Sequence, residues 1–338
     1  DLMIRHAAIL IALGACLSLA LSACGGDDNG NAVAPKLKVV TSVSPITSIV
    51  ENIGGTAIDL QGVIPENVNS HTFQPPSSTA TAFKDADLIV FNGLKLDEPL
   101  LDMARANQRG GAVILLLGDQ AITQDQYKYG SSFPQSAGNP NPHLWTDPDL
   151  AKKYASLVHD QLVKMDERNK DYYDTNLNAY QKRLERLDQQ IRVAVQTVPQ
   201  SDHKLLTYHD AWVYWADRYG FTVIGAIQPP GFGEPTDQQI TAIIDQVKTQ
   251  KVPAIFGSEV FPSDIADKIA GESGVKFVDG LRDDDLPGAP GDEDHSYIGL
   301  MVNDMRIIIP ALGGDASPMD IVDPSLVFSG ESTARYAE

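Results

Sequence analysis

Cysteine is nearly absent from this sequence of 338 residues, and both cysteines, Cys16 and Cys24, lie close to its beginning. Beyond residue 24 the chain has no thiol that could form a disulfide or bind a metal ion as a thiolate. Long apolar runs are scarce too, because the run from Ala7 to Ala20 is shorter than the roughly 20 residues of a membrane-spanning helix. The stability of the chain must therefore come from its hydrophobic core.

Basic residues are also few. The sequence has 26 lysines and arginines against 45 aspartates and glutamates, which gives a formal charge of -19. This balance argues against nucleic acid as a partner. Two enzyme motifs are missing as well, namely His-Glu-x-x-His and the Gly-x-Ser-x-Gly elbow. With 43% hydrophobic residues, the chain is predicted to form one or two well-cored domains.

The first 23 residues are typical of a signal peptide, with Arg5, an apolar run and then small residues. The sequence Leu-Ser-Ala-Cys that ends at Cys24 resembles the bacterial lipobox, which implies cleavage before Cys24 and lipidation of its sulfur. An ordinary cleaved signal is the alternative. Residues 24–35 are rich in Gly, Asp, Asn and Ala, so we expect a flexible tether there.

From Lys36 onward, apolar strand-like runs alternate with helical patterns. This order predicts an α/β fold of two lobes, each with a mainly parallel sheet flanked by helices. The lobes are expected over residues 36–168 and 199–312. Between them an apolar residue recurs every three or four positions, which predicts one long rigid connecting helix over 169–198. A coiled-coil dimer would show the same pattern. The tail over 313–338 has weak periodicity, and its role is unknown.

Three histidines and one aspartate are the candidate metal ligands. His143 lies in a proline-rich loop just before a predicted helix start, where Asp147 is expected as N-cap and Pro148 as first helical residue. His71, His209 and Asp279 follow predicted strands. In a parallel sheet, ligands bind at the carboxyl ends of the strands, so these side chains should meet in a cleft between the lobes.

Three imidazoles and one carboxylate suit zinc in a tetrahedral site, whereas manganese prefers more oxygen donors. Taken alone, each of the four residues could be an ordinary loop or capping residue. Glu259 is a candidate for a residue that orients a ligand histidine from outside. A zinc hydrolase is a second hypothesis, but catalytic zinc usually keeps one coordination position open, and here Asp279 would fill it. A surface adhesin is a third.

Several motifs resemble the metal-binding solute receptors of ABC importers for zinc and manganese. They are Asn69-Ser-His-Thr-Phe-Gln-Pro75, Ala86-Asp-Leu-Ile-Val-Phe-Asn-Gly93, Asn141-Pro-His-Leu-Trp-Thr-Asp-Pro148 and Tyr208-His-Asp-Ala-Trp212. The resemblance implies a monomeric, non-enzymatic extracytoplasmic lipoprotein that holds one zinc ion, or else manganese or iron, and delivers it to a membrane permease. It also implies that His71, His143, His209 and Asp279 are the ligands.

The sequence departs from the family pattern in several places, among them the segment 94–98, where the usual Glu after Asn-Gly is replaced. Asn69 and Ser70 precede His71 where the family more often has Asp-Pro, and the long histidine-rich loop of many zinc receptors is absent. An acidic segment over 282–295 is present instead. We interpret it as a solvated surface loop; the alternative is a weak collecting loop for cations at the rim of the cleft.

Overall fold

The computed structural model describes residues 35–258, 260–332 and 334–337. The predicted signal peptide, the tether, the lipidated Cys24 and the candidate Glu259 lie outside the described residues. Residues Lys36–Glu338 cluster as one compact unit. No helix of the described part has the length and apolar character needed to cross a membrane.

The first sheet has five parallel strands in the order β4-β3-β1-β2-β9. Strand β3 is buried along its whole length, which explains why its sequence, Leu-Ile-Val-Phe, is an uninterrupted apolar run. The bounds are Leu37–Thr41 for β1, Ile58–Pro65 for β2, Leu88–Phe91 for β3, Val113–Leu116 for β4 and Arg335–Ala337 for β9.

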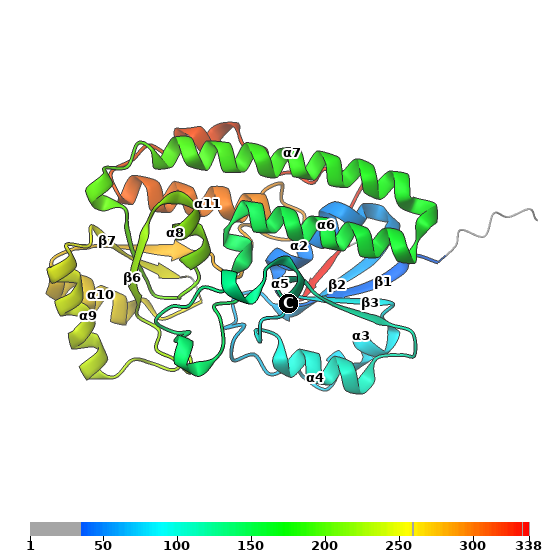
Figure 1. The fold of residues 1–338 in the computed structure, drawn as a ribbon, viewed down its shortest axis with the longest axis horizontal. Helices are drawn as coiled ribbons and strands as arrows, with labels where there is room; N and C mark the ends of the chain where they lie inside the picture. Colours follow the sequence, from blue (N-terminus) through cyan, green and yellow to red (C-terminus); the bar gives the residue numbers. More distant parts are fainter. Residues whose placement is uncertain (1–34, 259, 333, 338) are drawn as a thin grey trace, which may run out of the picture. The chain divides into compact units, whose positions relative to one another are not determined.

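The second sheet has four parallel strands in the order β6-β5-β7-β8. They span Lys204–Thr207 for β5, Thr222–Ala226 for β6, Ala254–Ser258 for β7 and Lys276–Leu281 for β8. Because each sheet is parallel and helices connect its strands, the predicted α/β class is confirmed. The two sheets lie at opposite ends of the ribbon in Figure 1.

Helices occupy most of the segments between strands. In the first half they are α2 (Ser44–Gly54), α3 (Thr79–Asp85), α4 (Glu98–Asn107), α5 (Leu117–Ala121) and α6 (Pro148–Met165). In the second half they are α7 (Lys170–Val195), α8 (Val213–Tyr219), α9 (Asp237–Gln250), α10 (Ser263–Ser273) and α11 (Tyr297–Ala311). As predicted, Asp147 caps α6 by accepting the backbone N–H of Asp149, and Pro148 is its first residue.

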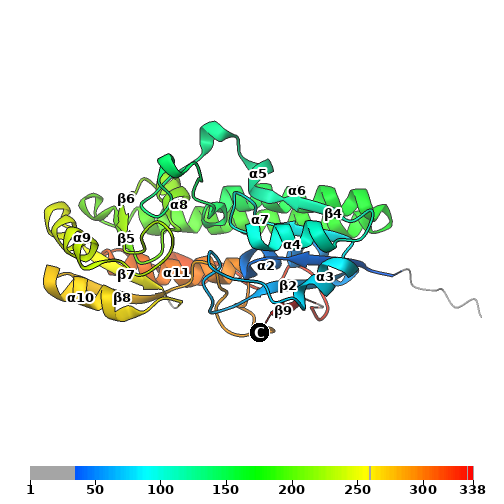
Figure 2. The same ribbon diagram turned by 90° about the horizontal axis from the view of Figure 1, so that it is seen from below.

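The longest helix is α7, with 26 residues and a length of about 39 Å at 1.5 Å per residue. It runs alongside both sheets in the two views of Figures 1 and 2. Its apolar positions, among them Tyr180, Leu184 and Ile191, are buried. The stripe packs on α6, α2 and α11 of the same chain, so it does not need a coiled-coil partner. The helix is shorter than the predicted 169–198 because a 3-10 turn precedes it and a hydrogen-bonded turn over 196–198 leads to Pro199.

The tail contributes to the first sheet. Its strand β9 pairs in parallel with β2, and its 3-10 helix Ser317–Ile321 packs on α7. The Tyr336 hydroxyl donates to Glu51 Oε2 of α2 over 2.7 Å, and Val327 N–H donates to the Asn52 side chain. The segment that sequence periodicity left without a role therefore covers the edge of β2.

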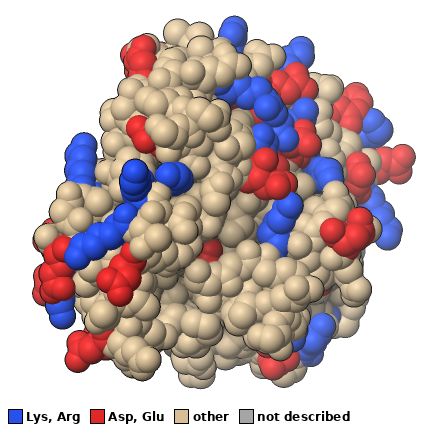
Figure 3. All heavy atoms as spheres, turned by 60° about the vertical axis from the view of Figure 1, so that its left-hand side comes forward, with Lys and Arg blue, Asp and Glu red and all other residues tan. Residues whose placement is uncertain are grey.

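Charged side chains of both signs are interspersed on the face drawn in Figure 3, around a broad area of uncharged residues. The acidic surplus of the chain forms no single large patch on this face.

Candidate metal centre

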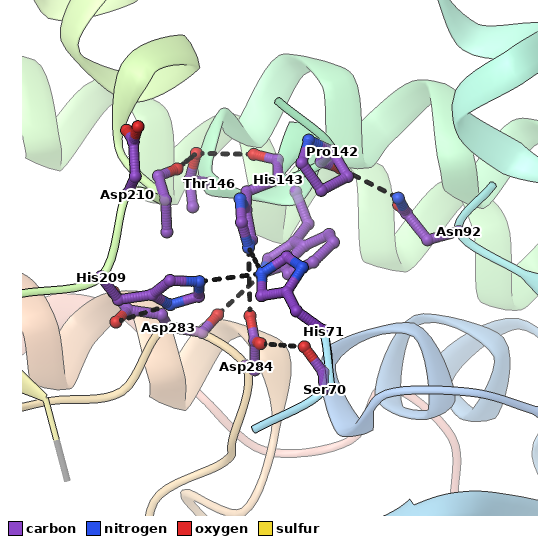
Figure 4. A network of polar contacts seen from close by, with 12 residues as sticks. Ser70, His71, Asn92, Pro142, His143, Thr146, His209, Asp210, Asp283 and Asp284 are labelled. Atoms are coloured by element: carbon purple, nitrogen blue, oxygen red, sulfur yellow. Dashed lines mark hydrogen bonds and ion pairs between the residues drawn. The ribbon is translucent and has the colours of Figure 1, made fainter. Parts of the chain in front are cut away.

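Three loops bring the three predicted histidines together (Figure 4). His71 lies in the loop after β2, and His209 follows β5 by two residues. His143 precedes the single 3-10 turn Leu144–Thr146 that leads into α6. The two strands belong to different sheets, so the site is built from both halves of the compact unit, as expected from the carboxyl-edge rule.

An asparagine two residues before the histidine shapes two of these loops. The Asn69 side-chain oxygen accepts the backbone N–H of His71 at 3.0 Å, and Asn141 does the same for His143 at 3.1 Å. Such side-chain turns fix a short loop without regular secondary structure. The replacement of the usual Asp-Pro by Asn69-Ser70 therefore keeps the local turn.

The three imidazole rings converge through their Nε2 atoms. His71 Nε2 lies 3.2 Å from His143 Nε2 and 3.0 Å from His209 Nε2. Ligand atoms that surround one zinc ion at bonds of about 2.0–2.1 Å are separated by about 3.3 Å in a tetrahedron. The spacing of the three nitrogens is thus close to what a single bound ion requires.

Hydrogen bonds to the opposite ring nitrogens orient two of these ligands. His143 Nδ1 lies 2.8 Å from the Asn141 side-chain oxygen, and His209 Nδ1 lies 3.2 Å from Asp283 Oδ2. Both oxygens accept hydrogen bonds, so in the neutral ring each Nδ1 carries the proton and each Nε2 offers a lone pair to a metal ion. Asp283 is held in turn by Trp212, whose Nε1–H donates to Asp283 Oδ1 at 2.6 Å.

The carboxylate beside the histidines is that of Asp284. Its Oδ1 lies 3.6 Å from His143 Nε2, and the ligand atoms of the four residues all lie within 4.8 Å of one another. Asp284 is buried, its Oδ2 accepts the hydroxyl of Ser70, and its Oδ1 has no hydrogen-bond partner among the described residues. A buried carboxylate oxygen without a donor is costly, and a bound cation would satisfy it.

The predicted ligand Asp279 is not in this cluster, and Asp284 takes its place. Asp279 is an exposed residue within β8, where its Oδ1 accepts the N–H of Gly280 and lies against Gly257 of β7. The expected strand ended at Val278, but β8 continues to Leu281. The carboxylate of the cluster, Asp284, does follow the end of β8. The sequence prediction placed that end too early and therefore selected Asp279.

The acidic segment is only partly the solvated loop that we expected, because residues 288–294 are exposed but the residues before them are not. Asp283, Asp284 and Asp285 are buried, and so is His295, which we expected at the surface. Asp283 orients a ligand histidine, whereas the candidate for that role from the sequence, Glu259, lies outside the described residues. The run of three aspartates after a strand was the available signal, but three adjacent charges resemble a solvated loop in sequence.

Burial and neighbouring charges separate the pKa values of the three histidines. Burial, and then the charge of His209, holds the pKa of His71 and of His143 well below the ordinary value. Burial also lowers the pKa of His209, but Asp284, Asp283 and Asp210 together outweigh it and raise that pKa. Two rings are therefore neutral and ready to bind a cation, while the third attracts a proton that a metal ion must displace.

Sequence comparisons relate the chain to metal-binding proteins. A family model described as zinc-uptake complex component A, periplasmic, matches residues 39–311. The manganese-binding lipoprotein MntA of Halalkalibacterium halodurans is 26% identical over 297 residues, covering 88% of this chain and 95% of that protein. The iron-binding protein YfeA of Yersinia pestis is 26% identical over 286 residues, covering 85% and 90%.

Solved structures share the fold. The periplasmic zinc binding protein TroA from Treponema pallidum superposes with a TM-score of 0.74 at 24% identity, covering 82% of this chain and 99% of that one. A cadmium-bound periplasmic metal binding protein from Candidatus Liberibacter asiaticus gives a TM-score of 0.71 at 24% identity, covering 82% and 100%. At this identity the likeness shows the fold alone.

Proposed function

Because the chain belongs to the family of periplasmic zinc-uptake components, which are solute receptors and not enzymes, we propose that it captures a zinc ion and delivers it to an ABC importer. His71, His143 and His209 are the nitrogen ligands, and Asp284 is the oxygen ligand. The divalent ion is the cargo of this protein.

The position of Asp284 is the observation that favours zinc. Its Oδ2 is engaged by Ser70, so Oδ1 alone faces the three nitrogens. One carboxylate oxygen and three imidazoles give the four-coordinate set that zinc prefers, whereas manganese takes more oxygen ligands. When Asp283 and Asp284 are both ionised, their two negative charges balance those of a divalent ion.

Manganese or iron is the alternative cargo. This alternative is favoured by the names of relatives, since the two quoted above are described as manganese-binding and iron-binding. A receptor for any of these metals would use the same four residues.

Delivery requires a membrane permease as partner. We propose that lobes over 36–168 and 199–312 hold the ion between them, with the helix between them as a spacer. The lipid anchor proposed at Cys24 would keep the receptor outside the cytoplasm, at the membrane surface. Relatives described as lipoproteins support this arrangement.

Native mass spectrometry with equimolar zinc and manganese tests the proposed cargo. We expect one zinc ion per monomeric chain, and loss or weakening of that binding in His209→Ala. Retention of manganese against zinc would overturn the choice of metal but keep the receptor role. No bound metal would overturn the receptor role itself.

A further inference from the structure

The ring of Phe232 lies flat on the ring of His71. The two ring centroids are 4.4 Å apart and the rings are inclined by 9°. His71 belongs to the loop after β2, whereas Phe232 belongs to the Pro229-Pro230-Gly231-Phe232-Gly233 turn after β6. The stack therefore joins loops that follow strands of different sheets, directly at a metal ligand.

The backbone at Phe232 is held in an unfavourable conformation. Its φ is +61°, a region that bulky side chains rarely adopt, and the preceding Gly231 has a φ of +88°. Such conformations persist where the surrounding structure requires them, often at ligand clamps. Here the conformation places the phenyl ring over His71.

His71 differs from the other two ligand histidines. His143 and His209 are buried and have Nδ1 hydrogen bonds to Asn141 and Asp283. His71 is only partly buried, and its Nδ1 has no hydrogen-bond partner among the described residues. Aromatic contacts, with Phe232 above all, are therefore what orient its ring.

A cavity of about 260 Å³ adjoins this stack. Its walls include His71, Phe133 and Phe232, whereas none of the other three metal-site residues lines it. Phe133 is buried and inclined against both rings, at 5.4 Å from His71 and 5.4 Å from Phe232. His71 is thus the one proposed ligand that borders this cavity, and the rings of Phe133 and Phe232 both contact His71.

We propose that Phe232 is a positioning residue that holds His71 in its metal-binding orientation and sets the rate at which the ion leaves. Release begins when the ring of Phe232 swings off His71 and lets that imidazole turn away from the ion toward the cavity. The inference rests on the proposed function, since it concerns the same metal site.

Stopped-flow dissociation of Zn²⁺ into an excess of a fluorescent chelator tests this inference on the full chain. In Phe232→Ala we expect dissociation about 3- to 10-fold faster, the range that loss of one aromatic pair implies. Phe232→Tyr should restore the slow rate, because it keeps the ring. Thermal unfolding of the metal-free variants checks that the fold is unchanged.

Phe261→Ala is the matched control. The Phe261 ring lies 5.4 Å from that of His209, but Asp283 already orients His209. We expect its dissociation rate to match that of the unmodified chain. Equal rates in Phe232→Ala and the unmodified chain, or equal acceleration in both alanine variants, would overturn the role of Phe232. Failure of the unmodified chain to bind zinc would instead overturn the proposed function.

Discussion

At the scale of single residues, the site depends on four donor atoms that converge on one point. Three Nε2 atoms and the Asp284 Oδ1 atom face one another, and Asp284 Oδ1 has no hydrogen-bond partner among the described residues. Asn141 and Asp283 accept from the Nδ1 atoms of His143 and His209, which turns the Nε2 atoms of these two rings toward the shared point. The donor set is therefore arranged in advance for a cation.

Substituting Asp279, the ligand predicted from the sequence, and Asp284, the carboxylate in the cluster, shows which of the two binds the metal ion. We expect Asp284→Asn to weaken zinc binding by about 100-fold or more, because changes even to the partners of metal ligands cost about 10- to 100-fold. Asp279→Asn should leave the affinity unchanged, because Asp279 is exposed outside the cluster. Competition titration with a chelator measures both, and the reverse order would contradict the assignment of Asp284.

The pH dependence of zinc affinity should be set by the pKa of His209, because a proton on this ring competes with the metal ion. Its pKa is raised in the metal-free protein, so a proton occupies it at a higher pH than an ordinary histidine. Zinc affinity should be constant above that pKa and fall by about tenfold per pH unit below it, as one proton is displaced. His71 and His143, with lowered pKa values, should not compete in this range. A zinc titration series from pH 8 to pH 5 with undiminished affinity, or with a slope near three, would contradict this order.

At the scale of elements, the short strand β9 stabilises the first sheet. Tyr336 of β9 donates its hydroxyl to Glu51, a buried residue of α2. Burial raises the pKa of Glu51, and hydrogen bonds from Ser332 and Tyr336 offset part of this rise. The carboxylate thus depends on donors that the tail supplies.

Loss of one donor should lower the stability of the fold. Tyr336→Phe leaves a buried carboxylate oxygen without its partner, which costs about 1–3 kcal/mol of unfolding free energy. Tyr129→Phe is the control, because its hydroxyl has no hydrogen-bond partner among the described residues. Chemical denaturation measures both variants. If they prove equally stable, the hydrogen bond from Tyr336 to Glu51 does not stabilise the fold.

The element scale also shows what could be read from the sequence. The fold class, the capping of α6 by Asp147 and the convergence of His71, His143 and His209 follow from apolar periodicity, turn residues and the strand-end rule. The identity of the fourth ligand, Asp284, depended on where β8 ends. Strand ends are set by tertiary contacts more than by local preference, so the sequence did not locate it. Burial of Asp283–Asp285 required partners distant in sequence, such as Ser70 and Trp212, which no local pattern indicates.

At the scale of the whole compact unit, Lys36–Glu338, the long helix limits movement. Helix α7 packs on α2 beside the first sheet and on α11, which contacts β8 of the second sheet. Two ion pairs add to this packing, since Arg218 of α8 lies 2.8 Å from Asp188 of α7 and 3.2 Å from Asp147 at the start of α6. These contacts oppose a wide hinge closure.

Small-angle scattering should therefore give superimposable profiles for the metal-free and zinc-bound protein. Changes on binding are expected to be confined to loops such as the one that carries Phe232. A marked decrease in the radius of gyration on zinc binding would show that the two sheets close on the ion and that α7 does not hold them apart.

The most direct test of the metal centre is anomalous scattering at the zinc edge from crystals grown with one equivalent of zinc. We predict a single peak at about 2.0–2.2 Å from the Nε2 atoms of His71, His143 and His209 and from Asp284 Oδ1. A peak bound by Asp279, or one away from the three histidines, would contradict this account of the site.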